Sequence, residues 1–257
     1  MRAQTLPAAA GWRWLTGGFA IFRRNPPLLI LLVISYWFTV LLLNVIPILG
    51  AVLASLAIPG LSVGLMQACR DIERGETAGL QTLFGSLKDN PRTLTALGAL
   101  YLVATLAVLG ISTLVDGGEL LRFMLSTKPM DPEILESGRL ILPFSVVMLL
   151  LVPVLMAYWY APVLAAWHRL PVFKALFFSF VACWLNWRAF FLYGLGLVLV
   201  AAILPGVALG LLVAIFPGAQ NFLATLVTVP MVLTVAPTIF ASFYVSYRDV
   251  FTIADIA

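Results

Sequence analysis

Four long stretches without a single Asp, Glu, Lys or Arg constrain the fold of this chain more than any other feature of its sequence. The shortest stretch has 23 residues, which as an α-helix is long enough to cross about 30 Å of hydrocarbon. Charged residues make up only 10% of the chain, whereas they make up roughly a quarter of a soluble domain. The sequence therefore predicts an all-α polytopic membrane protein. The charge-free stretches are 25–69, 93–115, 140–167 and 189–247.

The rest of the composition argues against several other classes of protein. The basic residues are dispersed around the apolar stretches and do not form a basic domain, so no nucleic-acid partner is expected. Two separated cysteines, Cys69 and Cys183, do not support a disulfide framework, and with one His they make a weak metal site. The apolar run at 195–202 is continuous, unlike the alternating strands of a β-barrel. We therefore expect helices, with no cofactor and no metal.

Each of the two longest stretches has a break at its centre. The first break, at 44–50, combines Asn, Pro and Gly, and the second, at 217–221, begins with Pro-Gly. Both breaks favour a turn between two helices. The sequence therefore predicts six membrane spans, at 28–46, 48–69, 93–115, 140–167, 189–216 and 222–247.

The Lys and Arg residues near the span ends predict the orientation of the chain. If the N-terminus is cytoplasmic, twelve of the fifteen basic residues lie on the cytoplasmic side and three lie on the other side: Arg122, Lys128 and Arg139. We therefore expect a multi-pass protein of the bacterial inner membrane with both termini in the cytoplasm. The segment 116–139 would then be periplasmic.

The segments before the first, third and fifth spans share a pattern. In each of them, apolar residues recur at helical spacing and an Asn follows at the junction with the span: Asn25, Asn90 and Asn186. Amphipathic helices that carry aromatic and basic residues suit the membrane interface. An Asn at the start of a helix can accept hydrogen bonds from unpaired backbone N–H groups, so these three residues are expected to be N-caps.

The even-numbered spans also end alike, each with an Arg close to its last apolar residue: Arg70, Arg169 and Arg248. We therefore expect a single integral membrane domain, 1–257, built as a pseudo-threefold internal repeat. Each repeat would be a helical hairpin preceded by a cytoplasmic interfacial helix, in units of about 11–72, 77–170 and 171–250. The alternative stays open that aromatic and basic residues precede the spans of any membrane protein.

Inside the six predicted spans, tyrosines and cysteines are the only ionisable side chains. Ion-coupled transporters usually place an acid, an arginine or a histidine at membrane depth, so that mechanism is disfavoured. The sequence contains no metalloprotease, nucleophile-elbow or P-loop motif, and we do not expect an enzyme. Prolines in the even-numbered spans are expected to kink those helices, either as a structural feature alone or so as to open a shared cavity. These prolines are Pro59, Pro153, Pro162, Pro230 and Pro237.

Three segments carry a resemblance to a known family: Arg23-Arg24-Asn25-Pro26-Pro27, the aromatic-rich 173–180, and Trp184-Leu185-Asn186-Trp187-Arg188. Together with the six spans, they resemble a family of uncharacterised proteobacterial inner-membrane proteins. That family is distantly similar to the membrane domain of some glycerophosphodiester phosphodiesterases. The resemblance covers most of the chain and implies fold and location, and it brings no catalytic residues.

Three functions fit these observations. The protein could handle a lipid or another amphiphile at the cytoplasmic interface, where each arginine contributes about 1 kcal/mol of attraction to an anionic surface. It could instead be a structural or accessory subunit that docks to a membrane-protein partner or to its own copies, or a small-solute permease. For the first function, the candidate headgroup contacts are Arg23, Arg24, Arg92, Arg169 and Arg188, although these residues could equally serve only to set topology.

Overall fold

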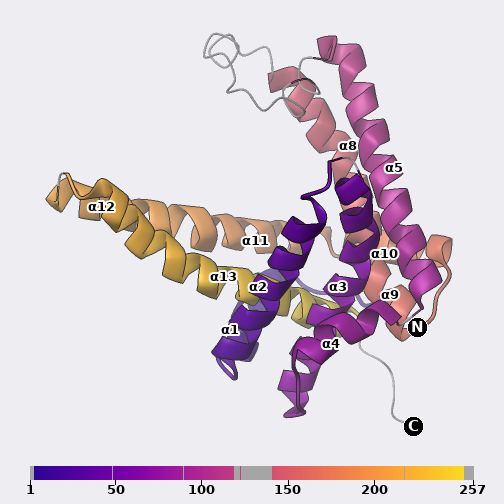
Figure 1. Cartoon of the computed structure of the whole chain (residues 1–257), viewed down its shortest axis with the longest axis horizontal. Helices are drawn as coiled ribbons and strands as arrows, with labels where there is room; N and C mark the ends of the chain where they lie inside the picture. Colours follow the sequence, from indigo (N-terminus) through magenta and orange to yellow (C-terminus); the bar gives the residue numbers. More distant parts are fainter. Residues whose placement is uncertain are drawn as a thin grey trace.

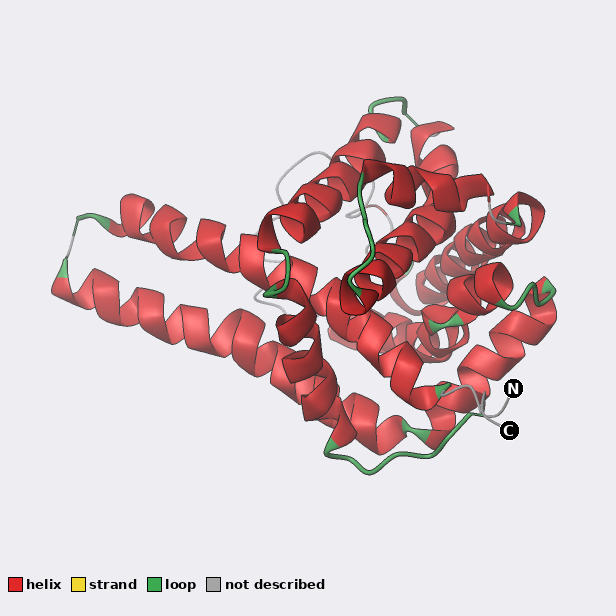
Figure 2. Cartoon of the chain, turned by 90° about the horizontal axis from the view of Figure 1, so that it is seen from below, coloured by secondary structure: helices red, strands yellow, loops and turns green. Residues whose placement is uncertain are grey.

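The structure, a computed structural model, describes residues 3–47, 49–88, 90–118, 122, 141–216 and 218–251, and these residues form helices joined by short loops (Figure 2). Six helical segments are long and apolar enough to cross a membrane, which confirms the predicted number of spans. They are α2 (Pro26–Leu43), α3 (Leu49–Arg74), α5 (Pro91–Asp116), α8 with α9 (Ile141–Trp159 and Ala161–Trp167), α11 with α12 (Trp187–Val198 and Leu204–Ile215), and α13 (Gln220–Val250). Most of the predicted periplasmic segment 116–139 lies outside the described residues.

A shorter helical segment stands before each odd-numbered span (Figure 1). These segments are α1 (Ala10–Phe22), α4 (Leu80–Gly85) with the 3-10 turn η1 (Ser86–Lys88), and α10 (Val172–Leu185). Consecutive long helices contact each other: α2 with α3, α3 with α5, α5 with α8, and α12 with α13.

Two spans that the sequence predicts as continuous helices are interrupted. The fourth span breaks at Tyr160, two residues before Pro162, whose ring clashes with the carbonyl four residues earlier and which lacks an N–H. The neighbouring helix α10 compensates for the break, because Ser179 Oγ accepts from the backbone N–H of Tyr160 at 2.9 Å. The fifth span contains a π-helical turn, η2 (Leu199–Ile203), just before Pro205, for the same steric reason.

The buried core lies at one end of the long helices. On α3 and α13, most buried side chains belong to the last half of the helix, and one hydrophobic cluster joins them to α1, α4, α9 and α10. We call this end the base: it comprises α1, α4, α9 and α10, the first turns of α2, α5 and α11, and the last turns of α3 and α13.

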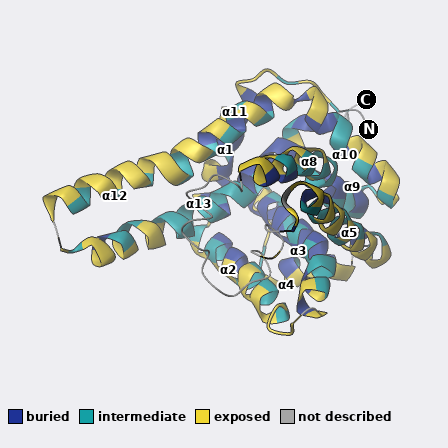
Figure 3. Ribbon diagram, turned by 90° about the horizontal axis from the view of Figure 1, so that it is seen from above, coloured by how far each residue is buried: buried dark blue, intermediate teal, exposed yellow. Residues whose placement is uncertain are grey.

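Away from the base, the long helices expose apolar side chains. Helix α12 has no buried residue, and with the neighbouring part of α13 it extends away from the rest of the molecule (Figures 1 and 3). A helix that is apolar all round and exposed in the monomer is typical of a segment surrounded by lipid or by other membrane helices.

The short helices are arranged cyclically around the base. Helix α4 packs on α3, α10 packs on α8 and α9, and α1 packs on α13. Each short helix therefore contacts the even-numbered span of the preceding pair, and the first short helix closes the ring on the last span. Glycines permit two of these contacts, since a Cβ on Gly64 would overlap the Leu83 backbone and one on Gly18 would overlap the Ser242 backbone.

Candidate functional site

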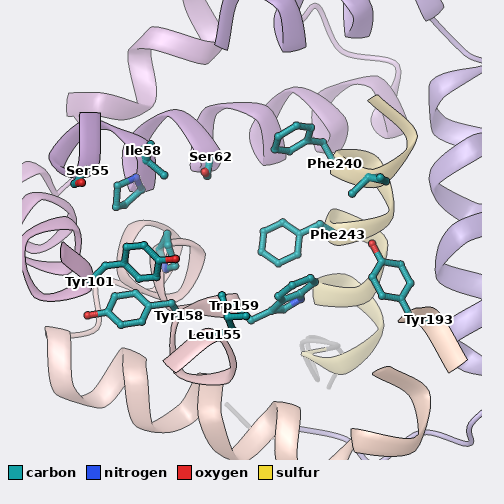
Figure 4. Close-up of a pocket in the computed structure, with 13 residues that line it drawn as sticks. Ser55, Ile58, Ser62, Tyr101, Leu155, Tyr158, Trp159, Tyr193, Phe240 and Phe243 are labelled. Carbon is teal, nitrogen blue, oxygen red and sulfur yellow. The ribbon is translucent and has the colours of Figure 1, made fainter. Parts of the chain in front are cut away.

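An apolar cavity of about 310 Å³ lies where α3, α8, α9 and α13 meet. Figure 4 shows residues of α3, such as Ser62, on one side of it and residues of α8, such as Leu155, on the opposite side. We call this space the aromatic cavity because six of its lining residues are aromatic. They are Tyr101, Tyr158, Trp159, Tyr193, Phe240 and Phe243.

Edge contacts between rings hold the walls of the aromatic cavity. The Trp159 ring meets the Phe243 ring edge to face, with centroids 5.1 Å apart, and the Tyr101 and Tyr158 rings meet in the same way at 5.0 Å. Such pairs prefer defined geometries, so the walls are positioned by helices α5, α8 and α13 together. Because Trp159 is the last residue of α8, the break at Tyr160 sets where its ring lies.

Two lining residues keep a buried polar atom without a hydrogen-bond partner among the described residues. These atoms are the Tyr158 hydroxyl oxygen and Trp159 Nε1. A buried polar group without a partner costs about 1–3 kcal/mol, so such groups are rare in proteins. The cavity wall is mostly apolar, and these two polar atoms are buried behind its surface.

A second pocket, of about 400 Å³, lies at the base, between the ends of α3, α9 and α13. Three arginines line it, so we call it the basic pocket. Its polar and charged lining residues are Arg70, Arg74, His168, Tyr244, Tyr247, Arg248 and Asp249, and Trp167 and Phe251 complete the wall.

The predicted prolines divide into two groups. Pro59, inside α3, and Pro162, in the first turn of α9, line the aromatic cavity. The other three, Pro153 in α8 and Pro230 and Pro237 in α13, lie within their helices and outside the lining of this cavity. The even-numbered spans thus surround a shared cavity, with two of the five prolines at its wall.

The structure does not gather the five arginines that the sequence suggested as headgroup contacts. The guanidinium of Arg23 lies over the Phe19 ring, and that of Arg188 lies over the ring of its neighbour Trp187. Arg92 is exposed in the first turn of α5.

The other two arginines lie near different elements of the base. Arg24 donates from its guanidinium to the backbone carbonyl of Glu73 at 2.6 Å. Arg169 has a positive φ of 50° and lines a separate pocket together with Lys88 and Asn90. None of the five arginines lines the basic pocket.

All three junction asparagines stand where an odd-numbered span begins, but only Asn25 caps its helix with its side chain, so the predicted side-chain cap is wrong for Asn90 and Asn186. Asn25 is the N-cap of α2, and its side chain accepts from the backbone N–H of Leu28 at 3.3 Å. Asn90 occupies the same position before α5, but its side chain donates to the Ala165 carbonyl of α9 at 3.1 Å. Asn90 therefore ties two elements together in addition to starting a helix.

Asn186 lies between α10 and α11 and holds the N-terminal segment. Its side-chain oxygen accepts from the Leu6 backbone N–H at 2.8 Å, and its amide nitrogen donates to the Gln4 carbonyl at 2.8 Å. The residue is only 1% exposed. Its side chain thus acts over 180 residues of sequence, which no local pattern indicates.

The sequence did not identify the residues of the basic pocket as binding residues. Arg70 and Arg248 were predicted only to mark the ends of even-numbered spans, and no binding role was predicted for His168. The signal that could have found the pocket is that shared ending, because two of the three arginines at the ends of the even-numbered spans line it.

The chain is similar over nearly its whole length to a bacterial membrane protein. The chain is 37% identical, over 265 residues, to a probable inner membrane protein of Burkholderia thailandensis, and the similarity covers 99% of this chain and 96% of that protein. No protein-family model and no solved structure matches the chain. Because the similarity is nearly full length, it includes the helices that form the aromatic cavity and the basic pocket.

Proposed function

This chain belongs to the same family of multi-pass bacterial inner membrane proteins as its Burkholderia relative, and from this premise we propose that it holds a lipid or another amphiphile within the membrane. The observation that carries the proposal is the aromatic cavity between α3, α8, α9 and α13. Its volume of about 310 Å³ lies at the lower end of the range of roughly 300–1,000 Å³ that is typical of ligand sites.

The chemistry of the wall favours an amphiphile over a polar solute. A small-solute permease needs a polar path, whereas this wall is mainly apolar, with aromatic rings on six of its thirteen lining residues. An apolar chain gains little by moving from lipid into the cavity, because lipid tails are as apolar as the cavity wall. Polar groups must therefore supply the selectivity.

We propose further that the base faces the cytoplasm. The excess of Lys and Arg on this side of the predicted spans supports that orientation, since cytoplasmic loops carry such an excess. Phe243 lies seven residues before the end of α13, which places the cavity about 10 Å from the end of the helix. A fluorescent protein fused to the C-terminus is expected to be fluorescent, and its failure to fluoresce despite insertion would contradict the orientation.

The predicted threefold repeat stays a proposal, with the cyclic packing of the short helices in its favour. In units 11–72, 77–170 and 171–250, the short helix of each unit contacts the even-numbered span of the unit before it. Three interfacial helices around one axis would close the base beneath the cavity. The remoter resemblance to the phosphodiesterase membrane domain also stays a prediction, and the function proposed here does not depend on it.

One observation favours the accessory-subunit alternative. Helix α12 exposes apolar side chains along its whole length, as a helix that docks to a membrane-protein partner or to a second copy of this chain would do. A stable co-purifying protein and no bound lipid would support that alternative.

Filling the aromatic cavity tests the proposed function. Ser62→Phe places a ring in the cavity, and Ser145→Phe makes the same change on an exposed face of α8. Native mass spectrometry of gently extracted protein is expected to find bound lipid on the unmodified chain and on Ser145→Phe, and at least tenfold less on Ser62→Phe. Equal lipid retention by both variants would contradict a ligand in this cavity.

A further inference from the structure

The basic pocket carries positive charge that the described part of the chain does not neutralise. Arg248 forms ion pairs with Glu73 and with Asp249, the latter at 3.0 Å. Arg70 and Arg74 have no ion pair with any carboxylate among the described residues. Both guanidiniums extend from the last turn and a half of α3, four residues apart, and therefore from the same face of the helix.

Aromatic residues position Arg70. Its guanidinium lies over the Trp167 ring, 4.9 Å from the centroid, and the Trp167 ring in turn meets the Tyr247 ring at 5.1 Å. A guanidinium that stacks on a ring keeps the N–H groups at its edge free, and these groups match the oxygens of a phosphate or a carboxylate. The packing therefore fixes the cation without using up its donors.

Neutral hydrogen-bonding groups complete the wall. His168 Nε2 lies 2.7 Å from the Tyr247 hydroxyl oxygen. Burial lowers the pKa of His168, and the nearby Arg70 guanidinium adds to this effect, so the imidazole is neutral at pH 7. The Tyr244 hydroxyl donates to Glu73 at 2.7 Å, and the same carboxylate pairs with Arg248.

Helices α3 and α13 line both the basic pocket and the aromatic cavity, and the two spaces follow one another along these helices. On α13, Phe243 of the cavity and Tyr247 of the pocket are one turn apart, about 6 Å along the axis. On α3, Ser62 and Arg70 are eight residues apart, about 12 Å. A molecule with a polar head and an apolar chain therefore matches the order of the two spaces.

We propose that the basic pocket binds a phosphate group, with Arg70 and Arg74 as its principal contacts. This inference rests on the proposed function, because it identifies the amphiphile as one whose head carries phosphate. A phosphate offers enough oxygens for both guanidiniums and for a tyrosine hydroxyl, and a phosphate monoester carries close to the two negative charges that the two unpaired arginines match. Phosphate on a lipid and phosphate on a soluble molecule share this chemistry.

Three probes separate the head from the chains: phosphatidic acid with two oleoyl chains, the diacylglycerol with the same chains, and inorganic phosphate. Binding of each to the purified full-length chain in detergent would be measured by native mass spectrometry. Phosphatidic acid is expected to bind at least tenfold more tightly than the diacylglycerol. This preference is expected to fall below threefold in Arg70→Gln and in Arg74→Gln.

Arg13→Gln is the matched control, because it removes the same charge from an exposed position of α1 outside the pocket. It is expected to keep the preference for phosphatidic acid. Arg74 is exposed, so Arg74→Gln tests the pocket even if loss of the Arg70 contact with Trp167 destabilises the fold. Thermal unfolding of each variant shows whether it is folded.

The outcomes distinguish this inference from the proposed function. Equal binding of phosphatidic acid and diacylglycerol, unchanged by the arginine substitutions, would overturn the phosphate site and leave amphiphile binding intact. Binding of inorganic phosphate that depends on Arg70 and Arg74, with neither lipid bound, would support the site and overturn the proposed function. Displacement of phosphatidic acid by inorganic phosphate would support the site and show that it recognises phosphate without the chains.

Discussion

At the scale of single residues, the sequence predicts where the junction asparagines lie in the fold better than it predicts which groups their side chains hydrogen-bond. The three junction asparagines do stand where odd-numbered spans begin, because an Asn followed by an apolar run is a local signal. Their hydrogen bonds differ, since Asn25 caps its own helix while Asn186 contacts a segment 180 residues away. Partners of that kind depend on the tertiary fold, which no local pattern encodes.

Asn186→Ala is expected to destabilise the protein and to release the N-terminal segment. The substitution removes the side-chain partner of the partly buried Leu6 N–H and of the Gln4 carbonyl, and each lost hydrogen bond costs about 0.5–1.5 kcal/mol. Thermal unfolding in detergent would report the destabilisation, and limited proteolysis would report the released segment.

Asn44→Ala is the control for this prediction, because Asn44 is exposed and its side chain donates only to the Val40 carbonyl of its own helix. Its unfolding is expected to match that of the unmodified chain within about 0.5 kcal/mol. If Asn186→Ala unfolds like Asn44→Ala, the N-terminal segment is held by other contacts.

At the scale of elements, hydropathy and turn residues suffice to place the six spans, but the prolines within them do not all act alike, since four of the five lie inside continuous helices. The six spans follow from the absence of charge, and the interruption at Tyr160 follows from the chemistry of Pro162. What pattern alone does not predict is the cyclic order of packing, in which α1 contacts α13 at the other end of the chain. A glycine that permits such a contact looks the same in sequence as a glycine that faces open space.

Gly64→Ala and Gly206→Ala separate these two kinds of glycine. A Cβ on Gly64 would overlap the backbone of α4, whereas nothing lies within 4 Å of a Cβ on Gly206 in α12. We expect Gly64→Ala to lower the free energy of unfolding by about 1–3 kcal/mol. Gly206→Ala is expected to be neutral or to stabilise by up to about 1 kcal/mol, because Ala favours a helix. The same thermal shift for both variants would mean that α4 does not pack on α3 as closely as described.

At the scale of the whole molecule, the site combines residues that are distant in sequence. Arg70, His168 and Arg248 come from three different spans and meet at the basic pocket. The sequence could therefore predict a cavity among these spans, from their prolines, and could not identify the arginines that lie beneath it. Four of the five arginines that it suggested lie at the starts of spans and only Arg169 lies at an end, whereas the pocket uses three other arginines, at the ends of α3 and α13.

The most direct test of the central claim is to locate a bound lipid by photolabelling. Phosphatidic acid with a diazirine on one acyl chain would be crosslinked to the full-length protein in bilayers, and the labelled peptides would be identified by mass spectrometry. A chain held in the aromatic cavity is expected to label 155–159 and 240–243, with labelling suppressed by Ser62→Phe and retained in Ser145→Phe. Labelling confined to the exposed helix α12, and unchanged by Ser62→Phe, would show that the protein meets this lipid only as surrounding bilayer.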